Sequence, residues 1–211
     1  MKQKKGRFIV IDGIDASGKG TVALALYGYL IEKGIPQKDI VFTFEPTGGE
    51  TGRKIREMLK ADKKPLDHAE KCLELYIKDR KEHLKNEIIP ALKEGKIVLC
   101  DRFKYSTIAY QGAQGIDMQK IIEMHKGMPI PDLTLILDID VNIAISRIKA
   151  DPKRNIFDKF EQKDFLNKVR QNFLAMKTLL PKENLVYLNA SKSKEEVFQE
   201  AKKEVNKILE F

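Results

Sequence analysis

The sequence predicts an α/β fold in which one open, parallel, five-stranded sheet carries helices on both faces. Short apolar segments alternate along the chain with longer amphipathic segments. The short segments are continuously apolar, as is typical of parallel strands covered on both sides. A length of 211 residues with 42% hydrophobic residues allows one good core, so we expect a single domain over residues 1–211.

Each predicted strand is a short apolar run bounded by polar or turn-forming residues. The five runs are Arg7 to Ile11, Ile40 to Phe44, Ile97 to Cys100, Leu133 to Leu137 and Leu185 to Leu188. Helical periodicity fills the intervals, with proline or glycine marking several ends. The predicted helices are Gly18 to Lys33, Thr51 to Lys60, Leu66 to Glu94, Asp117 to Lys126, Val141 to Ala150, Gln162 to Leu179 and Ser193 to Leu209.

Composition argues against membrane and secreted classes of protein. No apolar run is long enough to span a membrane, and the N-terminus passes from a basic lead into a strand without signal-peptide anatomy. We therefore expect a soluble, cytoplasmic protein. Cys72 and Cys100 are predicted to be reduced core thiols, and His68, His83 and His125 form no recognisable metal cluster.

A net charge of +8 raises the question of a polyanionic partner. The lysines are spread over every predicted helix instead of being gathered in one arm, and no nucleic-acid recognition module is recognisable. We interpret most of this charge as a solvated cationic surface and expect no specific nucleic-acid partner.

The stretch GIDASGKGT nearly matches the phosphate-binding pattern G-x-x-x-x-G-K-[ST]. Gly13, Gly18 and Lys19 fit, but Gly20 replaces the metal-binding hydroxyl and Thr21 comes one residue late. The loop joins a buried strand to an amphipathic helix, whose N-terminus would direct its amides at phosphates. A strand-to-helix turn without a ligand is the alternative, but this context favours a phosphate loop and a P-loop NTPase fold.

Acids and arginines follow two further predicted strands. Glu45 ends one strand, with Arg53 and Arg56 on the helix beyond it, and Asp101 and Arg102 follow the next strand. Each residue alone fits a helix cap, an ion pair or a solvated charge. Because the carboxyl ends of parallel strands meet at one edge of a sheet, we expect these side chains to line one crevice with the glycine loop.

The helix predicted from Leu66 carries an arginine on its apolar stripe. The stripe consists of Leu73, Tyr76, Ile77, Leu84 and Ile88, and Arg80 follows Tyr76 by four residues. A guanidinium on a core-facing stripe needs a polar partner. Binding of a base by the ring and the arginine, and an internal salt bridge to an acid, fit this spacing equally well.

These segments together resemble the thymidylate kinase family of P-loop nucleoside monophosphate kinases. The resemblance covers nearly the whole chain, through FIVIDGIDASGKGT, EPTGGETGRKIR, LELYIKDRKEHLKNEIIPAL, DRFKYSTIAYQG, PDLTLILDID and DKFEQKDFLNKVRQNF. It implies transfer of the γ-phosphate of ATP to dTMP, giving dTDP. The alternatives are a nucleoside monophosphate kinase with a broader or different base preference, for dUMP or purine monophosphates, and a non-catalytic nucleotide-binding switch.

The resemblance also implies roles for single residues. Asp15 lies beside the acceptor sugar and the reacting phosphates, Arg56 and Arg102 grip the acceptor phosphate, and Tyr110 crowds the 2′ position. The implied ATP-binding residues are Gly13, Ile14, Ala16, Ser17, Gly18, Lys19, Gly20 and Thr21. The implied dTMP-binding residues are Glu45, Arg56, Tyr76 (stacking on thymine), Arg80 (at the base edge), Arg102, Ser106, Tyr110 and Gln111, and the implied catalytic residues are Asp15, Lys19, Arg102 and Arg154.

The segment RIKADPKRNIFDKFE resembles the lid that closes over the donor phosphates in related kinases, as an insertion at about 150–160. Arg154 stands where relatives without a P-loop arginine carry a catalytic lid arginine. Lys159 replaces a usual arginine and lacks its bidentate fork, so Lys149, Lys153 and Lys159 remain alternative lid cations.

The sequence GKGT resembles the adenylate kinase version of the loop, in which no loop hydroxyl holds the metal directly. Mg²⁺ is then expected to be held mainly by donor phosphates and water. Asp15, Asp101 and Glu161 are the carboxylates expected near its shell. The resemblance further suggests a homodimer, for which the apolar stripe of the long helix offers a surface.

Overall fold

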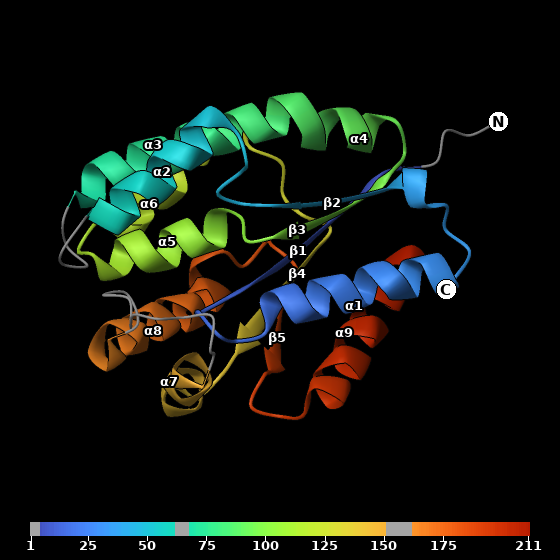
Figure 1. Cartoon of the computed structure of the whole chain (residues 1–211). Coiled ribbons are helices and arrows are strands. Elements are labelled where there is room, and N and C mark those ends of the chain that lie inside the picture. The colour runs from blue at the N-terminus through green and yellow to red at the C-terminus, as the bar shows by residue number, and fades with distance from the viewer. Residues whose placement is uncertain (1–4, 62–67, 151–161) are drawn as a thin grey trace.

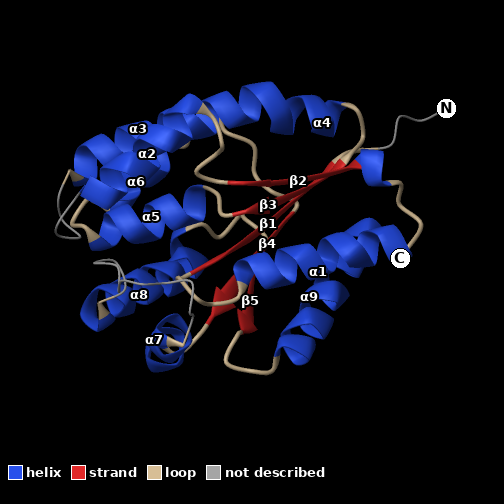
Figure 2. Cartoon of the chain, in the orientation of Figure 1, coloured by secondary structure: helices blue, strands red, loops and turns tan. Residues whose placement is uncertain are grey.

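The computed structural model describes residues 5–61, 68–150 and 162–211, and it confirms the predicted α/β architecture (Figures 1 and 2). One sheet of five strands has the order β2-β3-β1-β4-β5, and every neighbouring pair is parallel. The strands are β1 (Arg7–Gly13), β2 (Ile40–Phe44), β3 (Ile97–Asp101), β4 (Leu133–Asp138) and β5 (Leu185–Asn189). All five were predicted, each within two residues of its observed ends.

Helices cover both faces of the sheet, with α1 and α9 on one face and α3, α5 and α8 on the other (Figure 1). The helices are α1 (Lys19–Glu32), α2 (Glu50–Ala61), α3 (Ala69–His83), α4 (Ile89–Lys93), α5 (Lys104–Ala113), α6 (Met118–Met124), α7 (Val141–Lys149), α8 (Lys163–Leu179) and α9 (Lys194–Leu209). A short 3₁₀ turn, Gln37–Asp39, precedes β2. Within the described parts of the chain, no helix is both long enough and apolar enough to cross a bilayer.

The strand register gathers the polar strand ends at one edge of the sheet. Ile11 of β1 pairs with Asp101 of β3, and Phe44 of β2 pairs with the same Asp101. The residues after these strands therefore emerge side by side. This arrangement places Glu45 next to the Asp101 and Arg102 pair, as expected from the parallel topology.

The single long helix predicted from Leu66 to Glu94 is not a uniform α-helix. A π-helical segment, Leu84–Ile88, lies between α3 and α4. Pro90 stands at the start of α4 and cannot donate the backbone hydrogen bond of a continuous helix, so the preceding turn widens. The predicted start at Leu66 falls outside the described residues.

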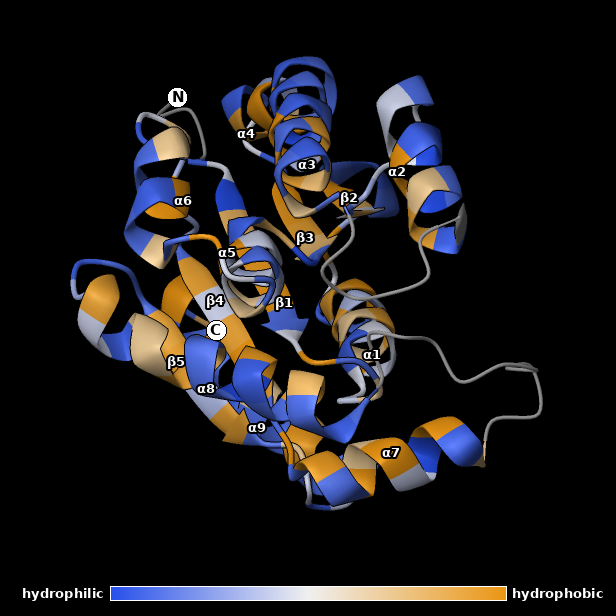
Figure 3. Cartoon of the chain, turned by 90° about the vertical axis from the view of Figure 1, so that its left-hand side faces the viewer, coloured by the Kyte–Doolittle hydropathy of each residue, from blue (hydrophilic) through white to orange (hydrophobic). Residues whose placement is uncertain are grey.

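The apolar stripe of this helix is used inside the subunit. Leu73 and Ile88 are fully buried in the core, and Ile77 and Leu84 are almost so. The stripe was expected to offer a dimerisation surface. This expectation is wrong, because these four side chains are already buried in the core of their own subunit. Figure 3 shows β4 and β5 largely in the hydrophobic colour, whereas hydrophobic and hydrophilic bands alternate along the surrounding helices.

Helix α5 was missed in the sequence because its N-terminal cap comes from a distant strand. Its first residues offer no local capping signal, and Phe103 at the N-cap position makes no side-chain capping bond. The carboxylate of Asp12, at the end of β1, instead accepts hydrogen bonds from the Phe103 and Ser106 amides at 3.1 and 3.0 Å.

A buried polar cluster ties α5 to the loop before β5. Lys104 donates to Glu183 at 2.6 Å, and the Tyr105 hydroxyl donates to the other oxygen of the same carboxylate at 2.5 Å. The side chains of Lys104 and Glu183 are only 6% and 8% exposed. A buried pair of this kind is costly to break, because removal of one partner leaves the other charge uncompensated.

We expect Glu183→Ala to lower the free energy of unfolding by about 3–5 kcal/mol, the usual cost of orphaning a buried ion. Denaturant unfolding gives this quantity from the midpoint and slope. Glu123→Ala is the matched control, because it removes the exposed pair of Glu123 with Lys126 and should cost less than about 1 kcal/mol. Equal losses in the two variants would contradict the buried-cluster argument.

Candidate active site

Two cavities open at the carboxyl edge of the sheet, one on each side of the glycine loop. The first, which we call the arginine cavity, has a volume of about 320 Å³ and is lined by Arg56, Arg80 and Arg102 among others. The second, the loop cavity, has a volume of about 560 Å³ and lies among the glycine loop, α1, α7 and the start of α9. Both volumes lie in the range of small-molecule sites.

The glycine loop has the backbone conformation of a phosphate-binding turn. Gly13 has a φ of 143° and Gly18 a φ of 96°, which favour glycine. A side chain at Gly13 would also approach the Leu137 carbonyl oxygen to 2.7 Å. Gly18 is the N-cap of α1 and makes no side-chain cap, so the first amides of the helix remain available to an anion.

Lys19 is held inside this loop. Its ammonium donates to the carbonyl of Ile14 at 2.8 Å, and the residue is only 7% exposed. Burial and then the positive charge of Arg102 lower the pKa of Lys19 to about 8, against the opposing effect of Asp15, Asp101 and Asp12. An anionic ligand in the loop would restore the charged form, as phosphate binding requires.

At Gly20, where the usual pattern has a hydroxyl side chain, a carboxylate from another strand lies nearby. A Cβ built at this position would contact Oδ2 of Asp101 at 3.4 Å, so the carboxylate of β3 occupies the neighbourhood of the missing hydroxyl. Oδ1 of Asp101 is buried and has no hydrogen-bond partner among the described residues. A buried acceptor in this state fits a cation or a water molecule.

Asp12 is a site residue that the sequence reasoning missed. It is fully buried and accepts from the Gly13 amide at 2.8 Å and from the Ser106 hydroxyl at 2.6 Å, besides the two α5 amides. Burial raises its pKa, while Arg102 and these hydrogen bonds lower it; the net direction is upward. The only signal in the sequence was an acid at the end of an otherwise apolar strand.

Arg102 is brought to the glycine loop by a strained backbone. Its φ of 69° lies in the left-handed region, which is uncommon for a residue with a side chain and is frequent at functional sites. Its guanidinium donates to Asp15 and, at 2.8 Å, to the Ser106 hydroxyl, and it lies 5.5 Å from the Tyr110 ring centre. Burial lowers the pKa of Arg102, but the negative charges of Asp15, Asp12 and Asp101 outweigh this effect and raise it, so the guanidinium stays charged.

Asp15 is tied down on both oxygens. Besides the bond from Arg102, its other oxygen accepts from the Tyr110 hydroxyl at 3.1 Å. The same hydroxyl accepts from the Asp15 amide at 3.1 Å. The predicted neighbours Asp15, Arg102, Ser106 and Tyr110 therefore lie together at one end of the arginine cavity.

Arg56 also faces this cavity. Its guanidinium donates to the carbonyls of Pro46 and Thr47 at 2.9 and 2.7 Å. Thr47 is itself fixed, because its amide and its hydroxyl donate hydrogen bonds to Asp79 at 2.8 and 2.6 Å. Neutral carbonyls orient Arg56 without cancelling its charge, which leaves it able to attract an anion.

Arg80 makes the internal salt bridge that its sequence position left open. It is 1% exposed, and its Nε donates to Glu45 at 2.8 Å. It nevertheless lines the arginine cavity together with Tyr76 and Gln111. Oε1 of Gln111 is buried and without a hydrogen-bond partner among the described residues.

Some predicted residues fall outside the described part of the chain. Arg154, Glu161, Lys153 and Lys159 all lie within residues 151–161, as does most of the predicted lid. Lys149 is described at the end of α7. Two steps earlier on the same helix, Arg147 donates to the carbonyls of Ala16 and Ala190 and lines the loop cavity, a role that the sequence reasoning missed.

Comparison with known proteins identifies this arrangement. The sequence profile of thymidylate kinases matches residues 11–201. The chain belongs to the thymidylate kinase family. This confirms the resemblance, and with it the predicted class of ATP-dependent nucleoside monophosphate kinase.

Individual relatives extend the match over most of both chains. The thymidylate kinase of Brachyspira hyodysenteriae is 43% identical over 171 residues, 80% of each chain. The probable thymidylate kinase of Pyrococcus horikoshii is 38% identical over 197 residues, 92% of each chain. A crystal structure of thymidylate kinase from Ehrlichia chaffeensis superimposes with a TM-score of 0.74 at 30% identity, covering 95% of this chain and 99% of that one.

We expect Asp12→Asn to lower the free energy of unfolding by about 2 kcal/mol, because it removes a buried charged acceptor from four hydrogen bonds. Denaturant unfolding measures the loss. Asp117→Asn, at the exposed cap of α6, is the matched control and should change stability by only a few tenths of a kcal/mol, because Asn caps helices as well as Asp does. An Asp12 variant as stable as this control would contradict a capping role for the carboxylate.

Proposed function

We propose that this chain transfers the γ-phosphoryl group of ATP to dTMP across the glycine loop. The observation that carries the proposal is the placement of two cavities on opposite sides of one phosphate loop. Asp15 lines the arginine cavity, and the adjoining Ala16, Ser17 and Gly18 line the loop cavity. A switch that only binds ATP has no use for the arginine cavity with its three arginines.

The donor is proposed to occupy the loop cavity. Amides of the loop from Gly13 to Gly20, together with Lys19, receive its phosphates, and Thr21 stands at the cavity wall. Phosphoryl transfer mainly requires that the reacting groups are positioned and that their negative charge is neutralised. The buried ammonium of Lys19 in the loop would supply positive charge for the donor phosphates.

The acceptor phosphate is proposed to lie between Arg56 and Arg102. Both guanidiniums face the arginine cavity and are oriented by fixed groups, carbonyls for Arg56 and Asp15 for Arg102. They offset the repulsion between the two anions during in-line transfer. The acceptor is already an anion at neutral pH, so no strong general base is needed.

The far end of the same cavity suits a thymine base. Arg80 can only donate, and Oε1 of Gln111 is a buried acceptor without a partner among the described residues. Thymine offers a carbonyl acceptor beside an N–H donor on its pairing edge, whereas cytosine offers the reverse. Tyr76 supplies a ring for stacking, and Tyr110, held by Asp15, narrows the side where a 2′-hydroxyl would lie.

Mg²⁺ fits the residues present. Asp101, whose Oδ1 has no hydrogen-bond partner within the described part of the chain, is the carboxylate best suited to reach its water shell, whereas both oxygens of Asp15 already accept hydrogen bonds. When bound, the ion would offset charge on the transferred phosphate. Among the described residues, no three acidic, His or Cys side chains form a metal cluster, in keeping with an ion held mostly by phosphate and water.

Three features of the proposal, namely the roles of Arg154 and Glu161 and the dimeric state, rest on the family resemblance alone. Arg154 is proposed as the catalytic lid cation and Glu161 as a further neighbour of the metal. A cytoplasmic homodimer is likewise proposed, and size-exclusion chromatography with light scattering tests the dimer directly. Its interface would lie away from the buried stripe of α3.

The deciding experiment measures ADP release from ATP and Mg²⁺ with dTMP, dUMP, dCMP, AMP, GMP or thymidine offered separately. We expect strong preference for dTMP. Arg102→Ala should lower kcat/KM for dTMP about 100-fold or more, because it removes a desolvated charge pair with the acceptor. Arg53 was expected to line the crevice, but it is exposed and belongs to the lining of neither described cavity, so the expectation is wrong for this residue and Arg53→Ala is the matched control.

Other outcomes would change specific parts of the proposal. Turnover spread evenly over several monophosphates would retain the chemistry and remove the thymine assignment. Binding of ATP without acceptor-dependent turnover would contradict the proposed reaction and favour the switch.

A further inference from the structure

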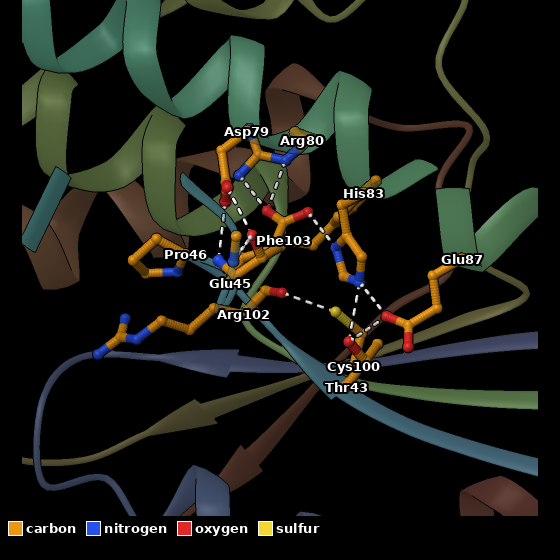
Figure 4. Close-up of polar contacts among 12 residues, drawn as sticks. Thr43, Glu45, Pro46, Asp79, Arg80, His83, Glu87, Cys100, Arg102 and Phe103 are labelled. Carbon is orange, nitrogen blue, oxygen red and sulfur yellow. Dashed lines mark hydrogen bonds and ion pairs between the residues drawn. The ribbon is translucent and has the colours of Figure 1, made fainter. Parts of the chain in front are cut away.

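His83 is a buried histidine whose two ring nitrogens both face acceptors (Figure 4). Nδ1 lies 3.0 Å from Oε1 of Glu45, and Nε2 lies 2.9 Å from Oε2 of Glu87. The Thr43 hydroxyl donates its proton to Glu87, so toward Nε2 it can only accept. Carboxylates only accept, and therefore both ring nitrogens must donate. The protonation state that satisfies this geometry is the imidazolium.

The charges around His83 agree with that state. Burial lowers its pKa, but the hydrogen bonds and negative charges of Glu45 and then Glu87 outweigh it, so the pKa of His83 is raised above the ordinary value. Arg80, one turn earlier on α3, shares the Glu45 carboxylate. Cys100 on β3 stays neutral, because burial raises the pKa of its thiol well above the usual range.

The carboxylate of Glu45 connects His83 to the arginine cavity. One oxygen receives His83, and the other receives Nε and Nη2 of Arg80, the latter at 2.6 Å. Figure 4 shows the resulting chain from Glu87 through His83 and Glu45 to Arg80, with Arg102 directed away from it. The side chains of Glu45 and Arg80 are 3% and 1% exposed, so water does not replace these contacts.

The opposite side of Arg80 is fixed as well. Nη1 lies 2.6 Å from Nε2 of His125, and Nη2 donates to the Thr107 hydroxyl at 3.1 Å. His125 faces the Ile121 carbonyl through Nδ1, so its Nε2 is the acceptor for Arg80. Burial and the nearby Arg80 lower the pKa of His125 to about 3, which keeps it neutral. As far as the described residues are concerned, these contacts occupy four of the five guanidinium donors, and one N–H of Nη1 remains for a ligand.

We propose that His83 is a positioning residue for the acceptor base: its imidazolium fixes Glu45, which in turn fixes the donor that Arg80 presents to the base. The proposal rests on the proposed role of Arg80 in the acceptor site. Loss of the His83 proton removes one of the two cations that hold Glu45, and the buried carboxylate then moves toward Arg80 alone. The guanidinium shifts with it, because both groups form one hydrogen-bonded unit.

The proposal separates affinity from chemistry. Within the described chain, the side-chain contacts of His83 are to Thr43, Glu45 and Glu87. The groups proposed to bind the phosphates, Arg56, Arg102 and the glycine loop, are not among them. Deprotonation of His83 should therefore raise KM for dTMP and leave kcat nearly constant. Both ring nitrogens face acceptors and the pKa of His83 is raised above its ordinary value, so acceptor binding should be tight below that raised pKa and should weaken as the pH rises through it.

The first test compares the pH dependence of KM for dTMP in the wild type, Glu87→Gln and Glu94→Gln. Glu87→Gln removes one of the two anions that raise the His83 pKa, so the increase in KM should move to lower pH by about one unit. Glu94→Gln neutralises another surface carboxylate, 60% exposed and paired with Lys96, and should retain the wild-type profile. Titration of dTMP itself is common to all three proteins and cancels in the comparison.

The second test removes the titrating group. We expect His83→Gln to raise KM for dTMP about tenfold at pH 7, a change equivalent to 1.4 kcal/mol, with kcat within about twofold and no remaining step in KM. Imidazole ¹⁵N NMR of the wild type, with this variant for assignment, should show His83 protonated on both nitrogens at pH 7. If His83→Gln does not fold, the comparison of Glu87→Gln with Glu94→Gln still tests the role of His83. The Glu87 side chain is 47% exposed, so its replacement should not prevent folding.

Failure of this proposal is distinguishable from failure of the proposed function. Arg80→Lys tests the base-recognition part of the proposed function: a wild type without preference for dTMP, or an Arg80 variant with unchanged KM, would remove the thymine assignment and, with it, the role of His83, while acceptor-dependent ADP release would still support the phosphoryl transfer. A selective wild type with a sensitive Arg80, but with superimposed Glu87→Gln and Glu94→Gln profiles, would overturn the role of His83 alone. A neutral imidazole at pH 7 would do the same.

Discussion

The site depends on one buried carboxylate at the end of the central strand. Asp12 accepts from the first amide of the glycine loop and from the first turn of α5, and so it joins the two segments that face the reacting groups. A negative charge inside an apolar core is expensive unless donors surround it. Here the donors are backbone amides whose positions define the loop and the helix. The same amides therefore offset the cost of burying the charge and hold the loop and the helix in place.

The arginines of the arginine cavity are oriented in three different ways. Carbonyl oxygens hold Arg56, the cavity-lining carboxylate of Asp15 holds Arg102, and the fully buried Glu45 holds Arg80. Neutral partners leave the charge of a guanidinium available to a phosphate, whereas a carboxylate partner reduces its attraction for anions and fixes its direction. This difference matches the proposed roles of Arg56 at a charged phosphate and of Arg80 at a neutral base edge. Arg102, paired with the partly exposed Asp15, combines a fixed direction with access to an anion.

The altered glycine loop illustrates compensation between distant parts of the sequence. A hydroxyl is absent at Gly20, and the carboxylate of Asp101 from β3 approaches the same place with one oxygen unpaired among the described residues. The two positions are far apart along the chain but adjacent at the carboxyl edge of the sheet. A loop motif read alone therefore understates what the assembled site can bind.

The sequence by itself determined the strands, the order in which strand and helix alternate, and the residues at the strand ends. These features follow from local apolar patterns and from the rule that parallel strands expose their carboxyl ends together. Only the tertiary structure decided the partner of Arg80, the cap of α5 and the role of Asp12. Each of these depends on contacts between residues distant in sequence, such as Asp12 with Ser106 and Glu45 with Arg80. Local periodicity carries no record of such pairings, because the same spacing serves an ion pair and a ligand contact equally well.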